Sequence, residues 1–214
     1  MVLEFAIGAF ATIFAIVNPV ANVPIFEAIT EGYALELRRR VIYKICLVTL
    51  ATLFVFGIFG QWIFSIYGIT IPAFKVAGGL LLFSVAYDML HGKTSQTKLS
   101  KIDEEQASTA EVVGIVPLGI PLFAGPGSIT IVMILVSESM GDGNIANLTS
   151  VFLAITLTVI ISYLLLINSH RVFAFMGRSG AMAFTRIMGI LLSAVAINFI
   201  FSGTLQFLQE AGLV

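Results

Sequence analysis

The chain has 214 residues, of which 58% are apolar and 11% are charged, and its mean hydropathy is +1.04. This composition excludes a soluble globular domain. The formal net charge of −1 gives no indication of nucleic-acid binding, so we expect membrane lipid around the chain and no nucleic acid. The apolar runs are continuous, whereas a transmembrane barrel alternates polarity in segments of about ten residues. The sequence therefore predicts an all-α polytopic membrane protein.

Six stretches of the sequence are long and apolar enough to cross a membrane. A spanning helix needs about 20 mostly apolar residues, because the hydrocarbon core is roughly 30 Å thick. The stretches are 5–29, 41–65, 69–90, 112–137, 148–169 and 184–208. The N-terminal stretch lacks the positive region of a cleavable signal peptide, so we expect it to be the first span.

The first and fourth stretches contain prolines that would break a helix. They read AIVNPVANVPIF over 15–26 and VPLGIPLFAGPGSITI over 116–131. Proline lacks an N–H donor and clashes with the carbonyl four residues back, so each one frees a backbone carbonyl. In lipid, a freed carbonyl is tolerated only where neighbouring groups or a water-filled cavity satisfy it. Broken spans at corresponding places in two halves indicate a transport site. The prolines concerned are Pro19, Pro24, Pro117, Pro121 and Pro126.

Small and polar residues surround both breaks. Asn18 and Asn22 are four residues apart and would share a helix face, and Ser128 and Thr130 add hydroxyls after the second break. Each break also exposes the N–H groups and positive dipole of a new half-helix, where a carboxylate would bind. Repair of the kinked backbone is the competing interpretation, but the repeated pattern favours a site for a small zwitterion. The predicted substrate-binding residues are Asn18, Pro19, Asn22, Gly125, Pro126, Gly127, Ser128 and Thr130.

Charged side chains within spans are functional candidates because they are costly inside the bilayer. Lys75 would share a helix face with Gly78, Gly79 and Leu82, from which it could pair with an acid, bind a substrate carboxylate or snorkel to the headgroups. For the acids, solvation at the membrane boundary is the simpler alternative to proton transfer. The candidates for charge or proton coupling are Lys75, Asp88, Glu27 and Glu138.

The sequence contains no recognisable enzyme or metal motif. An intramembrane hydrolase needs a nucleophile with a base, or a pair of metal ligands. There is no HExxH, no GxSxG and no histidine at the centre of a span. We therefore expect no enzymatic activity, no metal and no cofactor.

An internal repeat relates the two halves of the chain. Span three laid over span six with an offset of 110 residues gives seven identities in fourteen aligned positions. With an offset of 107, Asn18 and Pro19 meet Gly125 and Pro126. Each half has three spans, so the second must enter the membrane from the opposite side. The sequence predicts a first three-helix repeat over 1–90, a linker over 91–111 and an inverted repeat over 112–214.

Basic residues indicate the orientation in the membrane. Lys and Arg are retained on the cytoplasmic side, and ten of the eleven basic residues follow spans one, three or five. Loops 30–41, 91–111 and 170–183 are therefore expected to be cytoplasmic. Both termini are expected outside the cytoplasm. The protein is expected in the plasma (inner) membrane.

The segments NPVANVPIF and PLGIPLFAGPGSIT resemble the two hallmark segments of the MarC family, and the length and six-span layout also fit. Members of this family include SnatA-type transporters of small neutral amino acids. The resemblance implies a secondary transporter of glycine and alanine, coupled to an ion, with the proton expected. Alternating access would occur at a midplane site formed by the broken helices. The alternative is a channel, or an exporter of another small solute, and the sequence leaves a homo-oligomer open.

Overall fold

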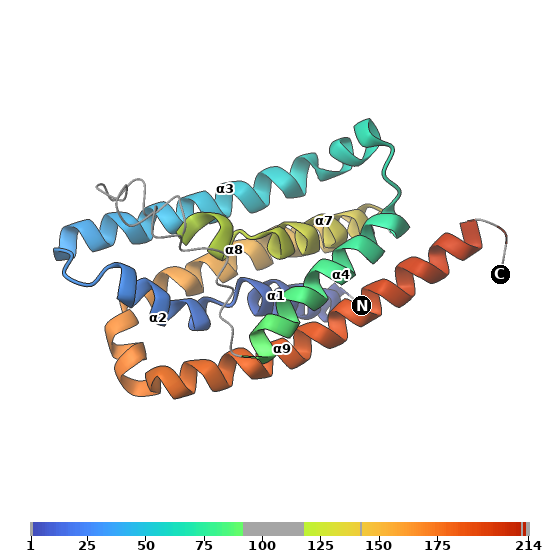
Figure 1. Ribbon diagram of the computed structural model, residues 1–214. Coiled ribbons are helices and arrows are strands. Elements are labelled where there is room, and N and C mark those ends of the chain that lie inside the picture. The colour runs from blue at the N-terminus through green and yellow to red at the C-terminus, as the bar shows by residue number, and fades with distance from the viewer. Residues whose placement is uncertain (1, 92–117, 142, 211, 213–214) are drawn as a thin grey trace.

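The computed structural model describes residues 2–91, 118–141, 143–210 and 212, and these residues form helices and turns without strands. The long helices lie side by side in a bundle (Figure 1). The linker beyond His91 and the start of the predicted fourth span, including Pro117, lie outside the described residues. In chain order the elements are α1 (Val2–Val17), α2 (Pro19–Ile29), α3 (Leu35–Tyr67), α4 (Ile71–Leu90), the π-helical turn η1 (Leu118–Phe123), α7 (Pro126–Gly141), α8 (Ile145–Ile167) and α9 (Ser169–Glu210).

The lengths and composition of these helices confirm an all-helical membrane protein. Five segments are long and apolar enough to span a bilayer: Val2–Ile29, Leu35–Gly60, Ile71–Leu90, Ile145–Ile167 and Ser179–Glu210. They correspond to predicted spans one, two, three, five and six. For the fourth span, the described apolar helix is the shorter Pro126–Gly141, which extends past the predicted end at residue 137.

Two segments predicted as loops are helical over much of their length. α3 begins at Leu35, because Glu36 and the arginines that follow are good helix formers and an acid suits the first turn. The predicted loop 170–183 lies within α9, and its helical structure is interrupted only at Gly177, where φ is 60° and ψ is −179°. Glycine adopts this conformation without a Cβ clash. The chain therefore turns at one residue and needs no longer loop.

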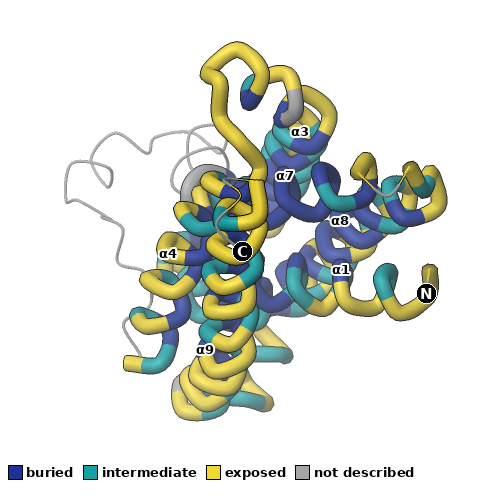
Figure 2. The backbone as a smooth tube through the Cα atoms, turned by 90° about the vertical axis from the view of Figure 1, so that its right-hand side faces the viewer, coloured by how far each residue is buried: buried dark blue, intermediate teal, exposed yellow. Residues whose placement is uncertain are grey.

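The outer surface of the bundle is apolar. Buried residues lie on the inward sides of the helices and exposed residues on the outward sides (Figure 2). The exposed positions include large apolar side chains. In water, a surface of this kind would drive association, whereas lipid tails cover it without cost. The exposed apolar side chains include Val55, Ile58, Leu153, Ile160, Leu164, Ile190 and Phe201.

The close packing of α4 on α9 depends on two glycines. A Cβ at Gly79 would lie 2.8 Å from the carbonyl oxygen of Ala196, and a Cβ at Gly189 would lie 3.1 Å from that of Ala86. Small residues let two membrane helices approach with their backbones in contact. The two contacts also show that α4 and α9 run in opposite directions.

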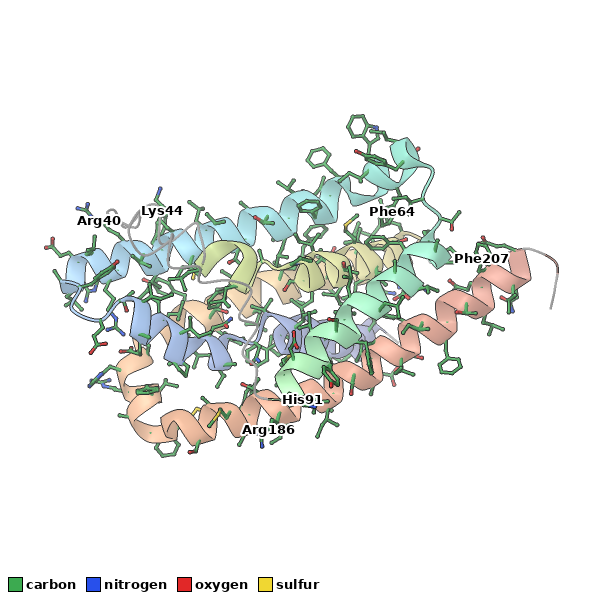
Figure 3. The ribbon with its side chains drawn as sticks, viewed as in Figure 1. Arg40, Lys44, Phe64, His91, Arg186 and Phe207 are labelled. Atoms are coloured by element: carbon green, nitrogen blue, oxygen red, sulfur yellow. The ribbon has the colours of Figure 1, made fainter. Side chains whose placement is uncertain are left out.

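The two ends of the bundle differ in character. Arg40 and Lys44 lie at one end, whereas Phe64 and Phe207 lie at the other (Figure 3). We call the first end the basic end and the second, which includes the turn between α3 and α4, the apolar end. The separation agrees with the expected clustering of cationic residues on one side of the membrane. The orientation of the termini stays a prediction.

Candidate functional site

The first junction is Asn18, which separates α1 from α2. Its φ of 45° and ψ of 58° place it in the left-handed region, and no other described non-glycine residue has a positive φ. Asparagine tolerates this region better than most residues. The Asn18 N–H donates to the carbonyl of Phe14 at 2.9 Å, so α1 closes normally before the chain changes direction at Pro19.

The carboxamide of Asn18 is buried but has an unused acceptor. The residue is 6% exposed, its side chain does not cap α2, and Oδ1 has no hydrogen-bond partner among the described residues. A buried polar atom without a partner costs about 1–3 kcal/mol. The oxygen is therefore available to a ligand that carries a hydrogen-bond donor or a positive charge.

Asn22 and Ser128 bond to the backbone at the junctions. Asn22 Nδ2 donates to the carbonyl of Val17 at 3.1 Å, and Ser128 Oγ donates to the carbonyl of Phe123 at 3.2 Å. Each side chain reaches five residues back, across its junction. For these donors, the structure fits the interpretation as backbone repair. The acceptor oxygens of both groups have further lone pairs.

The second junction, Ala124 and Gly125, separates η1 from α7 and lies beside the first. The N–H of Ala124 donates to the carbonyl of Gly119 at 2.9 Å, and α7 begins at Pro126. A Cβ at Gly127 would lie 2.6 Å from Cδ1 of Ile16, two residues before Asn18. The start of α7 thus packs directly on the end of α1.

The other predicted binding residues differ in their exposure. Pro19 and Thr130 are buried, Gly125 is half-buried, and Pro126 is exposed. The Thr130 methyl group packs on α4, since a Cβ at Gly78 would lie 2.3 Å from it. The two prolines are therefore not in equivalent surroundings, although each begins a helix.

Lys75 pairs with Glu138 and does not snorkel to the headgroups. Its side chain is 5% exposed, and Nζ lies 2.8 Å from Oε1 of Glu138 on α7. Nζ also donates to Oε1 of Gln206 on α9 at 3.4 Å. Two of the four coupling candidates, Lys75 and Glu138, therefore belong to one ionic contact, which joins α4, α7 and α9 toward the apolar end. We call it the Lys75 contact.

Glu27 pairs with Arg38, which sequence reasoning treated only as a marker of topology. Nη2 of Arg38 also donates to Ser169 Oγ at 2.7 Å, and the guanidinium lies 5.0 Å from the ring centroid of Phe26. This Arg38 contact joins α2, α3 and α9 at the basic end. The signal for it was the short turn between α2 and α3, which brings an acid and a base together.

Asp88 does not take part in the Lys75 contact. It is half-buried in the last turn of α4, about 20 Å along the helix axis from Lys75 at 1.5 Å per residue. Among the described residues, no group of three or more His, Cys, Asp or Glu side chains could hold a metal ion.

Comparison with known proteins relates the whole chain to one family. The family model described as MarC family integral membrane protein matches residues 3–208. A UPF0056 membrane protein of Methanocaldococcus jannaschii is 39% identical over 203 residues, which cover 95% of this chain and 97% of that protein. The UPF0056 membrane protein YvbG of Bacillus subtilis is 34% identical, with 95% of each chain covered. YhcE of Escherichia coli is 31% identical over 91% of this chain and 89% of its own length. No solved structure matches this chain.

Proposed function

Because the chain belongs to the MarC family of integral membrane proteins, we propose that it is a secondary transporter of small neutral amino acids such as glycine and alanine, as in the SnatA type. The substrate binds between the two junctions, near the middle of the membrane. The observation that carries this proposal is the buried, unpartnered Oδ1 of Asn18, beside the second junction. Irregular backbone inside a membrane protein is tolerated where it lines a site of this kind.

The two junctions offer complementary groups to a zwitterion. The N–H groups in the first turn of a helix have no intrahelical acceptor, and α2 and α7 each begin at a junction. These N–H groups and the positive helix dipoles suit a carboxylate. Oδ1 of Asn18 suits an ammonium group. Ile16 and Leu82 lie within 4 Å of a Cβ built at Gly127, and this close packing beside the second junction suits a substrate with a small side chain.

An inverted repeat explains the pairing of the helices. With the offset of 110 residues, Gly79 corresponds to Gly189 and Ala86 corresponds to Ala196. The Gly79–Ala196 contact therefore corresponds to the Gly189–Ala86 contact, as a twofold axis between α4 and α9 requires. η1 and α7 run opposite to α1 and α2 (Figure 1). With an offset of 109, several buried positions of α3 also match buried positions of α8. The matched pairs include Ile42 with Val151, Ile45 with Ala154, Thr49 with Thr158, and Leu53 with Ser162. These observations support two repeats, 1–90 and 112–214.

Alternating access then requires each end of the bundle to open in turn. The Arg38 contact ties α2 at the basic end, and the Lys75 contact ties α7 toward the apolar end. Each contact holds the half-helix that leaves one junction. Protonation of Glu27 or Glu138 removes the charge that its partner needs, which would let one end open while the other stays closed. The proton is therefore the coupling ion that we propose, and we place the basic end in the cytoplasm.

Counterflow in proteoliposomes tests this function and distinguishes it from a channel. Vesicles loaded with unlabelled alanine should transiently accumulate external labelled alanine, because a carrier exchanges substrate across its alternating site. A channel would give equilibration without accumulation. Absence of trans-stimulation by every small neutral amino acid would contradict the proposal and favour an exporter of another solute.

A further inference from the structure

Two buried threonines, Thr49 on α3 and Thr158 on α8, have hydroxyls without a hydrogen-bond partner among the described residues. They are 1% and 0% exposed. Buried Ser and Thr side chains in helices commonly donate to the carbonyl four residues back. The buried hydroxyls of Thr30, Ser139, Ser162 and Thr185 do so here. The two unpartnered hydroxyls are therefore free to bond a group that is not their own backbone.

Thr49 and Thr158 lie at the same height in the bundle. The rings of Phe54 on α3 and Phe152 on α8 have centroids 5.0 Å apart, and the two helices run in opposite directions (Figure 1). Thr49 comes five residues before the first ring, and Thr158 comes six residues after the second. The two threonines also occupy equivalent positions in the two repeats, with an offset of 109 residues. Two equivalent positions lie at the same height only where the twofold axis that relates the repeats crosses their helices.

The same argument places Asn18 at the height of this axis. Gly127 packs against Ile16. Gly127 comes two residues after Gly125, and Ile16 comes two residues before Asn18, so Asn18 and Gly125 also lie at the same height. These two residues occupy equivalent positions in the two repeats, with an offset of 107 residues. Three unpartnered oxygens, from the junction between α1 and α2, from α3 and from α8, therefore share one layer. The two remaining buried and unpartnered oxygens of the described residues, on Ser137 and Asn147, lie near the end of α7 and the start of α8.

We propose that Asn18, Thr49 and Thr158 form a layer of neutral oxygen ligands that holds a monovalent cationic group at the centre of the transport site, an inference that rests on the proposed function and its inverted repeat. The cationic group is the ammonium of the substrate or a sodium ion. Amide and hydroxyl oxygens suit hard cations. The acids Glu27, Asp88 and Glu138 all lie in the last turns of their helices, so they do not contribute charge to this layer. A layer without charge favours a monovalent over a divalent cation.

Threonine-to-valine variants test this layer, because valine keeps the shape of the side chain and removes the hydroxyl. Thr49→Val and Thr158→Val should each weaken alanine binding about tenfold, as expected for one lost hydrogen bond to a charged group. Thr49→Ser and Thr158→Ser should restore most of the affinity. Thr185→Val is the matched control, since this buried hydroxyl donates to the carbonyl of Ala181 at 2.8 Å. Isothermal titration of purified protein with alanine, in sodium chloride and in choline chloride, measures these affinities.

The two salts distinguish the two sources of the cation. If sodium binds, sodium chloride but not choline chloride raises the unfolding temperature without alanine, and T49V and T158V lose this stabilisation. If the ammonium binds, alanine affinity is equal in both salts, and propionate, which lacks an ammonium group, does not bind.

The proposed layer and the proposed function can fail separately. Wild-type affinities for alanine and sodium in both valine variants would overturn the layer and leave the transporter standing. A wild type that binds no small neutral amino acid would overturn the transporter. In that case, sodium stabilisation that both valine variants lose would support the layer, and no sodium effect in the wild type would overturn it as well.

Discussion

Replacing Gly79 by alanine tests how closely α4 and α9 pack. The new Cβ would lie 2.7 Å from Cγ1 of Ile200 and 2.8 Å from the carbonyl oxygen of Ala196. The oxygen belongs to the backbone, so the two helices must separate. Overpacking of this kind costs about 1–3 kcal/mol, and the higher helix propensity of alanine offsets up to about 1 kcal/mol. We expect the G79A variant to be less stable by about 1–2 kcal/mol.

Thermal or denaturant unfolding of the purified protein in detergent measures this change. Gly8→Ala is the matched control, because Gly8 lies in α1 and a Cβ there has no atom within 4 Å. This control should be neutral or slightly stabilising. Gly189→Ala should give a smaller loss than G79A, since its nearest neighbours lie at 3.0 Å and beyond. Equal stability of the G79A and G8A variants would refute the proposed packing of α4 on α9.

Three further predictions concern the first junction, the Lys75 contact and the orientation of the chain. Asn18→Gly keeps a residue that tolerates the φ of 45° but removes the carboxamide, so the protein should fold normally and bind alanine about tenfold more weakly; wild-type affinity would exclude Asn18 from the site. Glu138→Gln leaves Lys75 without its anionic partner and should lower the free energy of unfolding by about 2 kcal/mol. The loss is smaller than for a fully buried pair because the Glu138 side chain is 32% exposed. In a double-mutant cycle, adding Lys75→Met should recover much of this stability. An unchanged unfolding temperature for E138Q would show that the contact is not stabilising. Alkaline phosphatase fused after Glu210 should be active, since the basic residues are expected in the cytoplasm, and an active cytoplasmic reporter at this position would reverse the orientation.

The prolines and the lengths of the apolar runs predicted where the helices lie and where α1 ends. They could not assign roles to the polar side chains at the junctions, because these depend on local backbone geometry. Asn22 and Ser128 reach carbonyls five residues back only once the chain has changed direction. The left-handed backbone of Asn18 then leaves its oxygen without a partner.

The ionic contacts were only partly accessible from the sequence. Orientation arguments put Lys75 and Glu138 at the same end of the bundle, but the pairing of α4 with α7 depends on tertiary packing. Gln206 joins them from α9, far along the chain. The helical structure of 170–183 was missed because this segment, with its basic residues, lies between two predicted spans and was expected to form a loop, whereas one glycine, Gly177, makes the turn.

Accessibility of the second junction from both sides of the membrane tests the central claim most directly. Ser128 is buried in the first turn of α7, and Cys46 is the only native cysteine. In a Cys46→Ser background, the thiol of the S128C variant should react with a membrane-impermeant thiosulfonate in right-side-out and in inside-out vesicles. Saturating alanine should slow both reactions, while the C46S protein alone stays unlabelled. Reaction from neither side, or labelling that alanine leaves unchanged, would contradict an alternating substrate site between the two junctions.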